Sequence, residues 1–260
     1  MKTAEKKIPK KPVIAVAQIR YFDTAESHNV AKIKHFITAA AKSGADIICF
    51  PESCVHKYDI LKLDNDLVRE ICLSCKENNI WAIVTDTFES NGVSYKMSLL
   101  INRKGVIKGN YKKINLYDDY TKKGKKTFVF KTDFAKIGIA ICWDLAFPEV
   151  FSKMKKAGAE IIFCPSYWCY EYTAHHKDHK KREKKLLKSL VLSRAFENLC
   201  FVVLANPVLH KPGLVPYSAI SCPHYIMKEI SDKEGLIVKR INLGEIKKFE
   251  ELYPNKKPIK

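Results

Sequence analysis

Residues 137–149 read Ile-Gly-Ile-Ala-Ile-Cys-Trp-Asp-Leu-Ala-Phe-Pro-Glu, and this stretch indicates both the fold and the chemistry of the chain. An apolar run of strand length ends at Cys142, and Pro148 suits the first turn of a helix. A cysteine at such a junction lies near backbone N–H groups and a positive helix end, which lower a thiol pKa and stabilise an oxyanion. The alternative is a buried, unreactive cysteine, because free cysteine is among the most buried residue types.

The sequence on either side of this stretch alternates between strand and helix patterns. Short apolar runs predict strands, and apolar residues at helical spacing predict helices. We expect strands over 13–19, 46–50, 81–85, 93–101, 105–111, 128–130, 136–142, 160–164, 199–205, 217–221 and 236–241, and helices over 29–42, 61–78, 148–157 and 175–198. Strands and helices alternate early, and hairpin-like pairs interrupt the alternation. This mixture predicts an α/β fold in which helices cover layered sheets.

The length and composition favour one domain. The 260 residues, 47% of them hydrophobic, suffice for a sizeable core, and no Gly/Ser/Pro-rich linker divides them. We expect a flexible basic lead over residues 1–12, a single domain over 13–245 and a basic tail over 246–260. The lead is followed by no apolar segment of signal-peptide type, and no apolar run is long enough to span a bilayer. We therefore expect a cytoplasmic protein without membrane contact, and the nine irregularly spaced cysteines favour the same reducing compartment.

The formal net charge of +18 raises the question of an acidic partner. The charge is concentrated in Lys122–Lys126, in Lys177–Lys188 and in the tail from Lys247. Lysine dominates over arginine, and no aromatic-interleaved basic motif of the RNA-recognition type is present. We interpret these runs as solvated surface and keep nucleic-acid binding as the alternative.

Two groups of residues have spacings that metal sites also use. Cys72 and Cys75 form one C-x-x-C pair without a second ligand pair at zinc-site spacing. His175, His176 and His179 have helical spacing but no HExxH pattern. We therefore expect no metal site.

Two other strand ends carry isolated charge. Glu52 follows the strand that Pro51 stops, and Lys113 follows the strand that ends near Tyr111. Each alone has an ordinary explanation, as a capping carboxylate or as one lysine among many. Together with Cys142 they match a chemical need, because a cysteine that attacks an amide requires a base for its proton and a cation for the tetrahedral oxyanion.

These residues lie in motifs that resemble those of the nitrilase, or carbon–nitrogen hydrolase, superfamily, in its amidase-like branch. The resemblance is collinear and covers nearly the whole chain. It is carried by Phe50-Pro51-Glu52, Tyr111-Lys112-Lys113-Ile114-Asn115-Leu116, residues 138–149, Cys164-Pro165-Ser166-Tyr167-Trp168, Ser193-Arg194-Ala195-Phe196-Glu197-Asn198 and Glu234-Gly235-Leu236.

The resemblance implies a four-layer α-β-β-α sandwich that forms homodimers or higher homo-oligomers. It also implies Glu52 as base, Lys113 as cation and Cys142 as nucleophile. The backbone N–H of Trp143 would help to hold the oxyanion. A thioester intermediate would form without any metal or organic cofactor.

The side chains of Trp143, Tyr167 and Trp168 are candidates for the wall of a substrate pocket. The alternative is that these aromatic residues belong to the core, because aromatic side chains serve both purposes.

The sequence departs from the family pattern at three points. Asn115 stands where the lysine motif usually has histidine, and Ala146 stands where the nucleophile motif often has arginine. Many members carry a second glutamate between the lysine and the cysteine, but residues 114–141 contain none. Asp118 and Asp119 are the nearest substitutes, with shorter side chains.

We expect a hydrolase of linear non-peptide C–N bonds, with an amide or N-carbamoyl amine as small-molecule substrate. A true nitrilase is an alternative within the same chemistry. A second alternative is a glutaminase-like ammonia donor to a partner enzyme. A third is a degenerate member that binds a ligand or partner without turnover and contacts nucleic acid through its basic surface.

Overall fold

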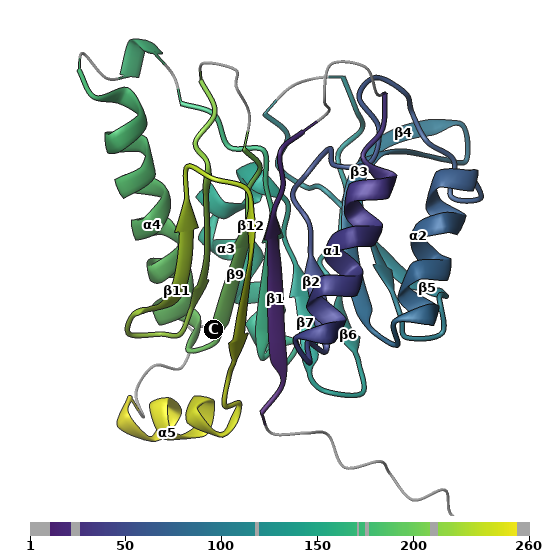
Figure 1. The fold of residues 1–260 in the computed structure, drawn as a ribbon. Coiled ribbons are helices and arrows are strands. Elements are labelled where there is room, and N and C mark those ends of the chain that lie inside the picture. Colours follow the sequence, from purple (N-terminus) through teal and green to yellow (C-terminus); the bar gives the residue numbers. More distant parts are fainter. Residues whose placement is uncertain are drawn as a thin grey trace, which may run out of the picture.

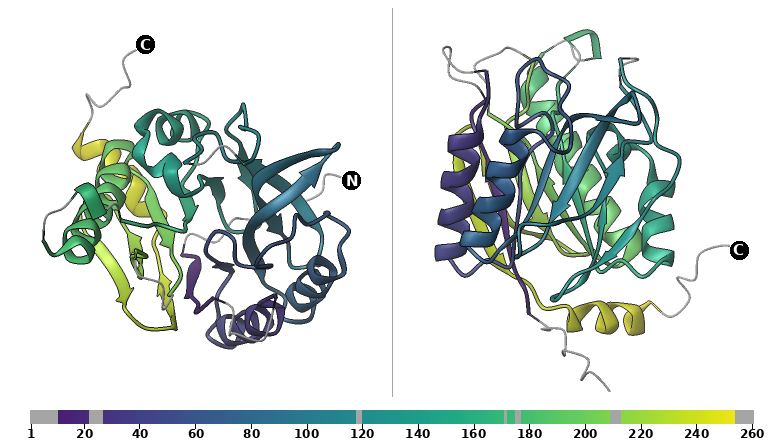
Figure 2. Two further views of the ribbon diagram at one scale, coloured as in Figure 1. Left: turned by 90° about the horizontal axis from the view of Figure 1, so that it is seen from above. Right: turned by 90° about the vertical axis from the view of Figure 1, so that its right-hand side faces the viewer.

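The computed structural model describes residues 11–21, 27–117, 120–170, 172–174, 177–208 and 213–253. Two six-stranded sheets face each other, and a pair of helices covers the outer face of each sheet (Figure 1). Seen from above, the helix pairs lie on opposite sides of the molecule (Figure 2). The expected four-layer α-β-β-α sandwich is thereby confirmed.

The strands are β1 (Val13–Gln18), β2 (Ile47–Cys49), β3 (Trp81–Ser90), β4 (Val93–Ile101), β5 (Ile107–Lys112), β6 (Val129–Lys131), β7 (Lys136–Ile139), β8 (Ile161–Pro165), β9 (Phe201–Ala205), β10 (Tyr217–Ser221), β11 (Ile226–Ser231) and β12 (Gly235–Arg240). The helices are α1 (Val30–Lys42), α2 (Asp66–Glu77), α3 (Pro148–Lys156), α4 (His179–Asn198) and α5 (Gly244–Leu252), with 3₁₀ turns η1 (Cys142–Ala146) and η2 (Tyr172–Ala174).

The two sheets have matching plans. The first has the order β12-β1-β2-β3-β4-β5 and is covered by α1 and α2, while the second has the order β11-β10-β9-β8-β7-β6 and is covered by α3 and α4. In each sheet the three central strands that alternate with helices are parallel, and the outer strands pair antiparallel. The hairpin-like pairs expected from the sequence are these outer strands.

The first strand shows why the central strands have no polar face. Ile14 and Val16 belong to the core that fills the space between the sheets. Val13, Ala15 and Ala17 pack instead into the core under α1 and α2. Because both faces of such a strand are buried, its sequence is a continuous apolar run rather than an alternating one.

The ends of these strands bring the singled-out residues to one edge of the sandwich. Glu52 follows β2, Cys142 follows β7, and Tyr167 and Trp168 follow β8. Lys113 directly follows the antiparallel strand β5. The carboxyl ends of parallel strands are where open α/β sheets bind ligands.

Several boundaries differ from those expected. Strand β3 continues to Ser90 and turns at Asn91-Gly92, whose positive φ values of 54° and 71° are those of a tight hairpin turn that the Asn-Gly pair favours. Helix α2 begins only at Asp66, because the Asn65 side chain accepts a hydrogen bond from the Leu67 N–H at 2.9 Å and caps it.

Other differences concern the second half of the chain. The strand expected over 136–142 ends at Ile139, and α4 begins at His179 rather than at residue 175. Strand β11 and helix α5 were not expected from the sequence, and α5 includes the first residues of the expected tail. Residues 1–10 of the lead and 254–260 of the tail lie outside the described residues.

Part of the lysine run on α4 is paired with acidic residues. Lys180 and Lys184 form ion pairs with Asp232 at 3.1 and 2.6 Å, and Lys188 pairs with Glu229 at 2.9 Å. These carboxylates therefore neutralise some of the charge that the sequence interpretation assigned to solvated surface. Within the described residues, none of the helices has the length and apolar character needed to cross a membrane.

Candidate active site

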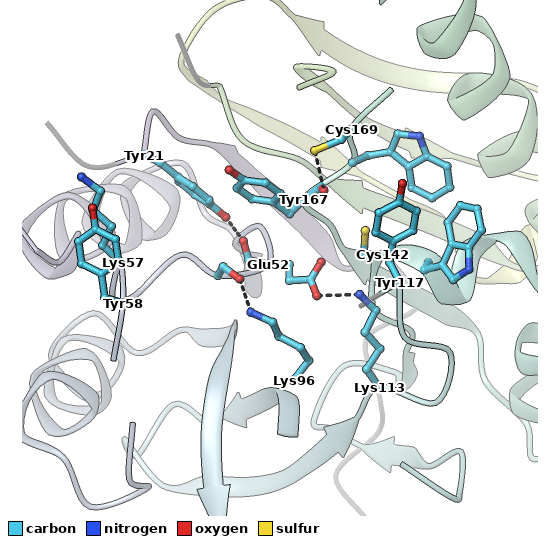
Figure 3. Close-up of a pocket in the computed structure, with 13 residues that line it drawn as sticks. Tyr21, Glu52, Lys57, Tyr58, Lys96, Lys113, Tyr117, Cys142, Tyr167 and Cys169 are labelled. Atoms are coloured by element: carbon cyan, nitrogen blue, oxygen red, sulfur yellow. Dashed lines mark hydrogen bonds and ion pairs between the residues drawn. The ribbon is translucent and has the colours of Figure 1, made fainter. Parts of the chain in front are cut away.

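A cavity of about 530 Å³ opens at the edge where these strands end (Figure 3). All six residues predicted for the site line it. The described residues of the lining are Tyr21, Glu52, Ser53, Lys57, Tyr58, Lys96, Lys113, Tyr117, Cys142, Trp143, Tyr167, Trp168 and Cys169. The cavity is therefore formed by segments from both sheets.

Glu52 and Lys113 form a buried ion pair in this cavity. Lys113 Nζ donates to Glu52 Oε1 at 2.9 Å, and the two residues are 5% and 3% exposed. The Glu52 backbone N–H donates to the Ser166 carbonyl at 3.1 Å, and the Lys113 N–H donates to the Lys96 carbonyl at 2.9 Å. Burial lowers the pKa of Lys113. The negative charges of Glu52 and of the ionised Cys142 raise it by more, so that the net pKa lies above its usual value.

Cys142 is the first residue of the turn η1, where the chain bends sharply after β7. Its φ of 46° is in the left-handed region, which a non-glycine residue adopts only at an energetic cost. The residue is 7% exposed, and its side chain reaches the cavity that Glu52 and Lys113 line. The tight turn explains why the strand expected to run to residue 142 stops at Ile139.

Asp144 connects the turn that carries Cys142 to the segment that carries Lys113. Its carboxylate accepts the Ile141 N–H at 2.9 Å and the Tyr111 hydroxyl at 2.8 Å. It also accepts the Asn115 backbone N–H at 2.8 Å and the Asn115 side-chain amide at 3.0 Å. Asn115 therefore holds this carboxylate through both its backbone and its side chain.

Arg194 fixes the other end of the turn η1. Its guanidinium donates to the carbonyl oxygens of Leu145 at 3.0 Å and Ala146 at 3.3 Å. One of its NH₂ groups also donates to Glu197 at 2.8 Å. The Arg-Ala-x-Glu-Asn motif of α4 thus supports the turn that carries Cys142 rather than lining the cavity.

The aromatic residues form one wall of the cavity. The Trp143 ring lies 5.6 Å from that of Trp168 and 5.3 Å from that of Tyr117, measured between centroids. The Trp168 indole N–H donates to the buried Glu183 carboxylate on α4 at 2.8 Å. Tyr167 stacks on Tyr21 with centroids 5.6 Å apart. These residues pack against the core and also line the cavity.

The environment of Cys142 favours its neutral thiol. Burial, and then the Glu52 carboxylate, raise the pKa of the thiol well above its usual value, whereas the Lys113 ammonium and the Tyr167 backbone N–H lower it. The net lowering expected from a helix end is wrong, because burial outweighs it and only a short 3₁₀ turn follows the cysteine. A neighbouring base is therefore needed to generate the thiolate.

The family model of carbon–nitrogen hydrolases matches residues 13–251. The chain belongs to the carbon–nitrogen hydrolase family. The predicted family and the predicted class of enzyme are thereby confirmed. The hydrolase is similar to the 2-oxoglutaramate amidase of Bacillus subtilis, with 26% identity over 245 residues that cover 88% of this chain and 90% of that protein. It is also similar to the N-carbamoylputrescine amidase of Oryza sativa, with 28% identity over 267 residues and coverages of 90% and 87%.

Solved structures support the fold of the hydrolase. The crystal structure of Saccharomyces cerevisiae Nit3, a member of branch 10 of the nitrilase superfamily, has a TM-score of 0.82 and 20% identity, with 96% of this chain and 97% of that chain covered.

Sequence reasoning missed seven of the described residues that line the cavity. They are Tyr21, Ser53, Lys57, Tyr58, Lys96, Tyr117 and Cys169. For Lys96 a signal was present, because it is a lone charge in the middle of the strand run 93–101. The others lie in connecting segments without a distinctive pattern.

The metal interpretations find no support among the described residues. There, no three His, Cys, Asp or Glu side chains gather as metal ligands. Cys75 is buried in α2 and Cys72 is half-buried on the same helix. His175 and His176 lie outside the described residues, as do Asp118 and Asp119, the suggested substitutes for the second glutamate.

Proposed function

We propose that this hydrolase cleaves linear non-peptide C–N bonds, in amides or N-carbamoyl amines, through a thioester on Cys142. The observation that carries the proposal is the buried ion pair of Lys113 and Glu52, 2.9 Å apart, in the cavity that also holds the cysteine. The similarity to proteins named as amidases of 2-oxoglutaramate and of N-carbamoylputrescine supports this class of substrate.

The first half of the reaction forms the thioester. Glu52 accepts the proton of the Cys142 thiol, and the sulfur attacks the carbonyl carbon so that an S–C bond forms and the carbonyl oxygen becomes an oxyanion. The Lys113 ammonium and the Trp143 N–H stabilise this oxyanion, since the first N–H groups of a helical turn have no partner within the turn. The C–N bond then breaks, and Glu52 returns the proton to the leaving nitrogen.

The second half hydrolyses the thioester. Glu52 takes a proton from water, the new oxygen–carbon bond forms, and the S–C bond breaks to release the acid. The proton then returns to the Cys142 sulfur. The same carboxylate acts as base and acid in turn, so each proton that is transferred passes through Glu52.

An ammonia-release screen over amides, N-carbamoyl amines and nitriles tests the proposal. We expect turnover of at least one amide or N-carbamoyl amine by the wild-type protein and none by Cys142→Ala. Mass spectrometry of the acidified reaction should find the acyl group on the peptide that contains Cys142. Cys72→Ala is the matched control, because this half-buried cysteine on α2 lies away from the cavity and its loss should leave turnover unchanged.

Two outcomes would contradict the proposal. An acyl group found only on Cys169, the exposed cysteine of the cavity lining, would move the nucleophile elsewhere. Turnover retained by Cys142→Ala would exclude the thioester route. A protein that binds amides but releases no ammonia would support the degenerate, non-catalytic interpretation instead.

A further inference from the structure

Among the described residues, the charged groups of the cavity do not balance. The described part of its lining contains three ammonium groups, those of Lys57, Lys96 and Lys113, but one carboxylate, that of Glu52. Since Lys113 pairs with Glu52 at 2.9 Å, two positive charges remain. Residues 114–141 contain no glutamate to match the second glutamate of many family members, and Asp118 and Asp119 of that segment lie outside the described residues.

Lys96 is the better placed of the two. It lies half-buried on β4, and its carbonyl oxygen accepts the Lys113 N–H at 2.9 Å, so both lysines come from the same edge of the first sheet. Its ammonium donates to Ser53 Oγ at 2.9 Å, and Ser53 is the residue after Glu52 in the sequence. Figure 3 shows the Lys96 and Lys113 side chains both reaching toward the Glu52 side of the cavity.

Among the described residues, the Lys96 ammonium has no ion-pair partner. In the described chain, no carboxylate oxygen lies within 4.0 Å of Lys96 Nζ, the longest distance of an ion pair. Asp86 is close enough for Lys96 to lower its pKa against the raising effect of burial. However, Asp86 is buried, and its carboxylate already accepts the N–H groups of Val55, His56 and Thr87.

A partly buried ammonium with one neutral acceptor is suited to bind an anion. An ammonium has three N–H donors, and Lys96 uses one of them for Ser53 Oγ. A second Lys96 N–H and the Ser53 hydroxyl can then donate to the same carboxylate. Such charge-assisted hydrogen bonds are stronger than neutral ones. Lys57, exposed at the rim with its ammonium 5.1 Å from the centre of the Tyr58 ring, adds positive potential that attracts an anion into the cavity.

We propose that Lys96 and Ser53 form a carboxylate-binding subsite, so that the substrate is an amide or N-carbamoyl amine that also carries a carboxylate. This inference rests on the proposed function for the position of the scissile bond at Cys142. The two lysines then bind different parts of the substrate. Lys113 stabilises the oxyanion at the reacting carbonyl, and Lys96 binds the carboxylate at the other end. The aromatic wall lines the side of the cavity where the cysteine lies.

The first test is a binding measurement that does not depend on turnover. Isothermal titration calorimetry with the Cys142→Ala protein compares malonamate, succinamate and glutaramate with the uncharged amides propionamide, butyramide and valeramide. We expect at least one of the three anionic amides to bind about 10- to 100-fold more tightly than its uncharged counterpart, as one charge-assisted contact would give.

A second variant tests whether Lys96 causes the preference for anionic amides. Lys96→Met in the Cys142→Ala background keeps most of the side-chain volume and should remove the preference, while the affinity for the uncharged amide stays within about twofold. Lys96→Arg keeps the charge and should restore part of the preference. Lys108→Met, an exposed lysine on β5 outside the cavity, controls for the change in net charge and should have no effect.

The outcomes separate this inference from the proposed function. Equal affinity for charged and uncharged amides, or an equal loss on both with Lys96→Met, would overturn the carboxylate subsite and leave the hydrolase proposal untouched. Absence of ammonia release from every substrate by the wild-type protein would overturn the hydrolase proposal, while the binding preference would still be measurable in the Cys142→Ala protein.

Discussion

The two sides of the cavity are held in very different ways. On the side of Cys142, one buried carboxylate accepts four hydrogen bonds from three residues, and Arg194 ties down the same turn from α4. On the side of Lys96, a single hydrogen bond to Ser53 positions the ammonium. Groups that act on a transition state need fixed geometry, whereas a group that holds the distant end of a substrate tolerates small movements.

The largest expected effect tests the tightly held side directly. Lys113→Met removes the cation that we assign to the oxyanion, and loss of such a donor costs about 3–4 kcal/mol of transition-state stabilisation. We expect kcat for an amide substrate to fall by about 10² to 10³-fold, measured by steady-state ammonia release. A fall of less than tenfold would mean that this lysine has no role in the transition state.

The second prediction concerns the connection between the two segments. Asp144→Asn keeps the shape of the side chain but replaces one acceptor oxygen with an NH₂ group, so that buried donors lose their partner. We expect a loss of about 2–3 kcal/mol in the free energy of unfolding, measured with urea. Asp232→Asn is the control, because Asp232 is a surface partner of lysines and should change stability by less than about 1 kcal/mol.

The third prediction sharpens the electrostatic description of Cys142. The thiolate is the species that iodoacetamide alkylates, and the Glu52 carboxylate raises the thiol pKa while Lys113 lowers it. Glu52→Gln removes the negative charge, so the pKa falls and alkylation at a given pH becomes faster. Lys113→Met removes the positive charge, so the pKa rises and alkylation becomes slower. Mass spectrometry of the Cys142 peptide across a pH series checks both signs, and shifts in the same direction would refute the arrangement.

The smallest expected effect lies on the loosely held side. Lys96→Met removes one hydrogen bond of a half-buried side chain and a charge without an ion-pair partner among the described residues. We expect the free energy of unfolding to change by less than about 1 kcal/mol. Urea denaturation beside Asp144→Asn provides the measurement, and a loss as large as that of the aspartate variant would show that both sides are equally rigid.

Local sequence patterns predicted most of the sandwich because each pattern has a local cause. Continuous apolar runs marked the central strands, whose two faces are both buried. Strand β11 was missed because its residues are half-buried or exposed and form no apolar run. Helix α5 was missed because its nine residues bury little, with only Ile246 buried.

The candidate site shows the same division. Glu52, Lys113 and Cys142 could be singled out because each is a polar group directly after a strand. Lys96 could not be assigned to the cavity, since its position depends on the pairing of β4 with β5 and on a turn in another segment. The support from Asp144 and Arg194 likewise joins residues that are far apart in the chain.

By itself, then, the sequence determined the layered α/β class, the family and the three candidate residues at the strand ends. Burial and strand termination can be recognised from patterns of consecutive residues. Only the tertiary structure decided which charges find partners. Ion pairing and burial depend on distances between segments that are far apart in the sequence. Only the tertiary structure therefore shows the pair of Lys113 with Glu52, the raised thiol pKa of Cys142 and the position of the Lys96 ammonium beside Ser53.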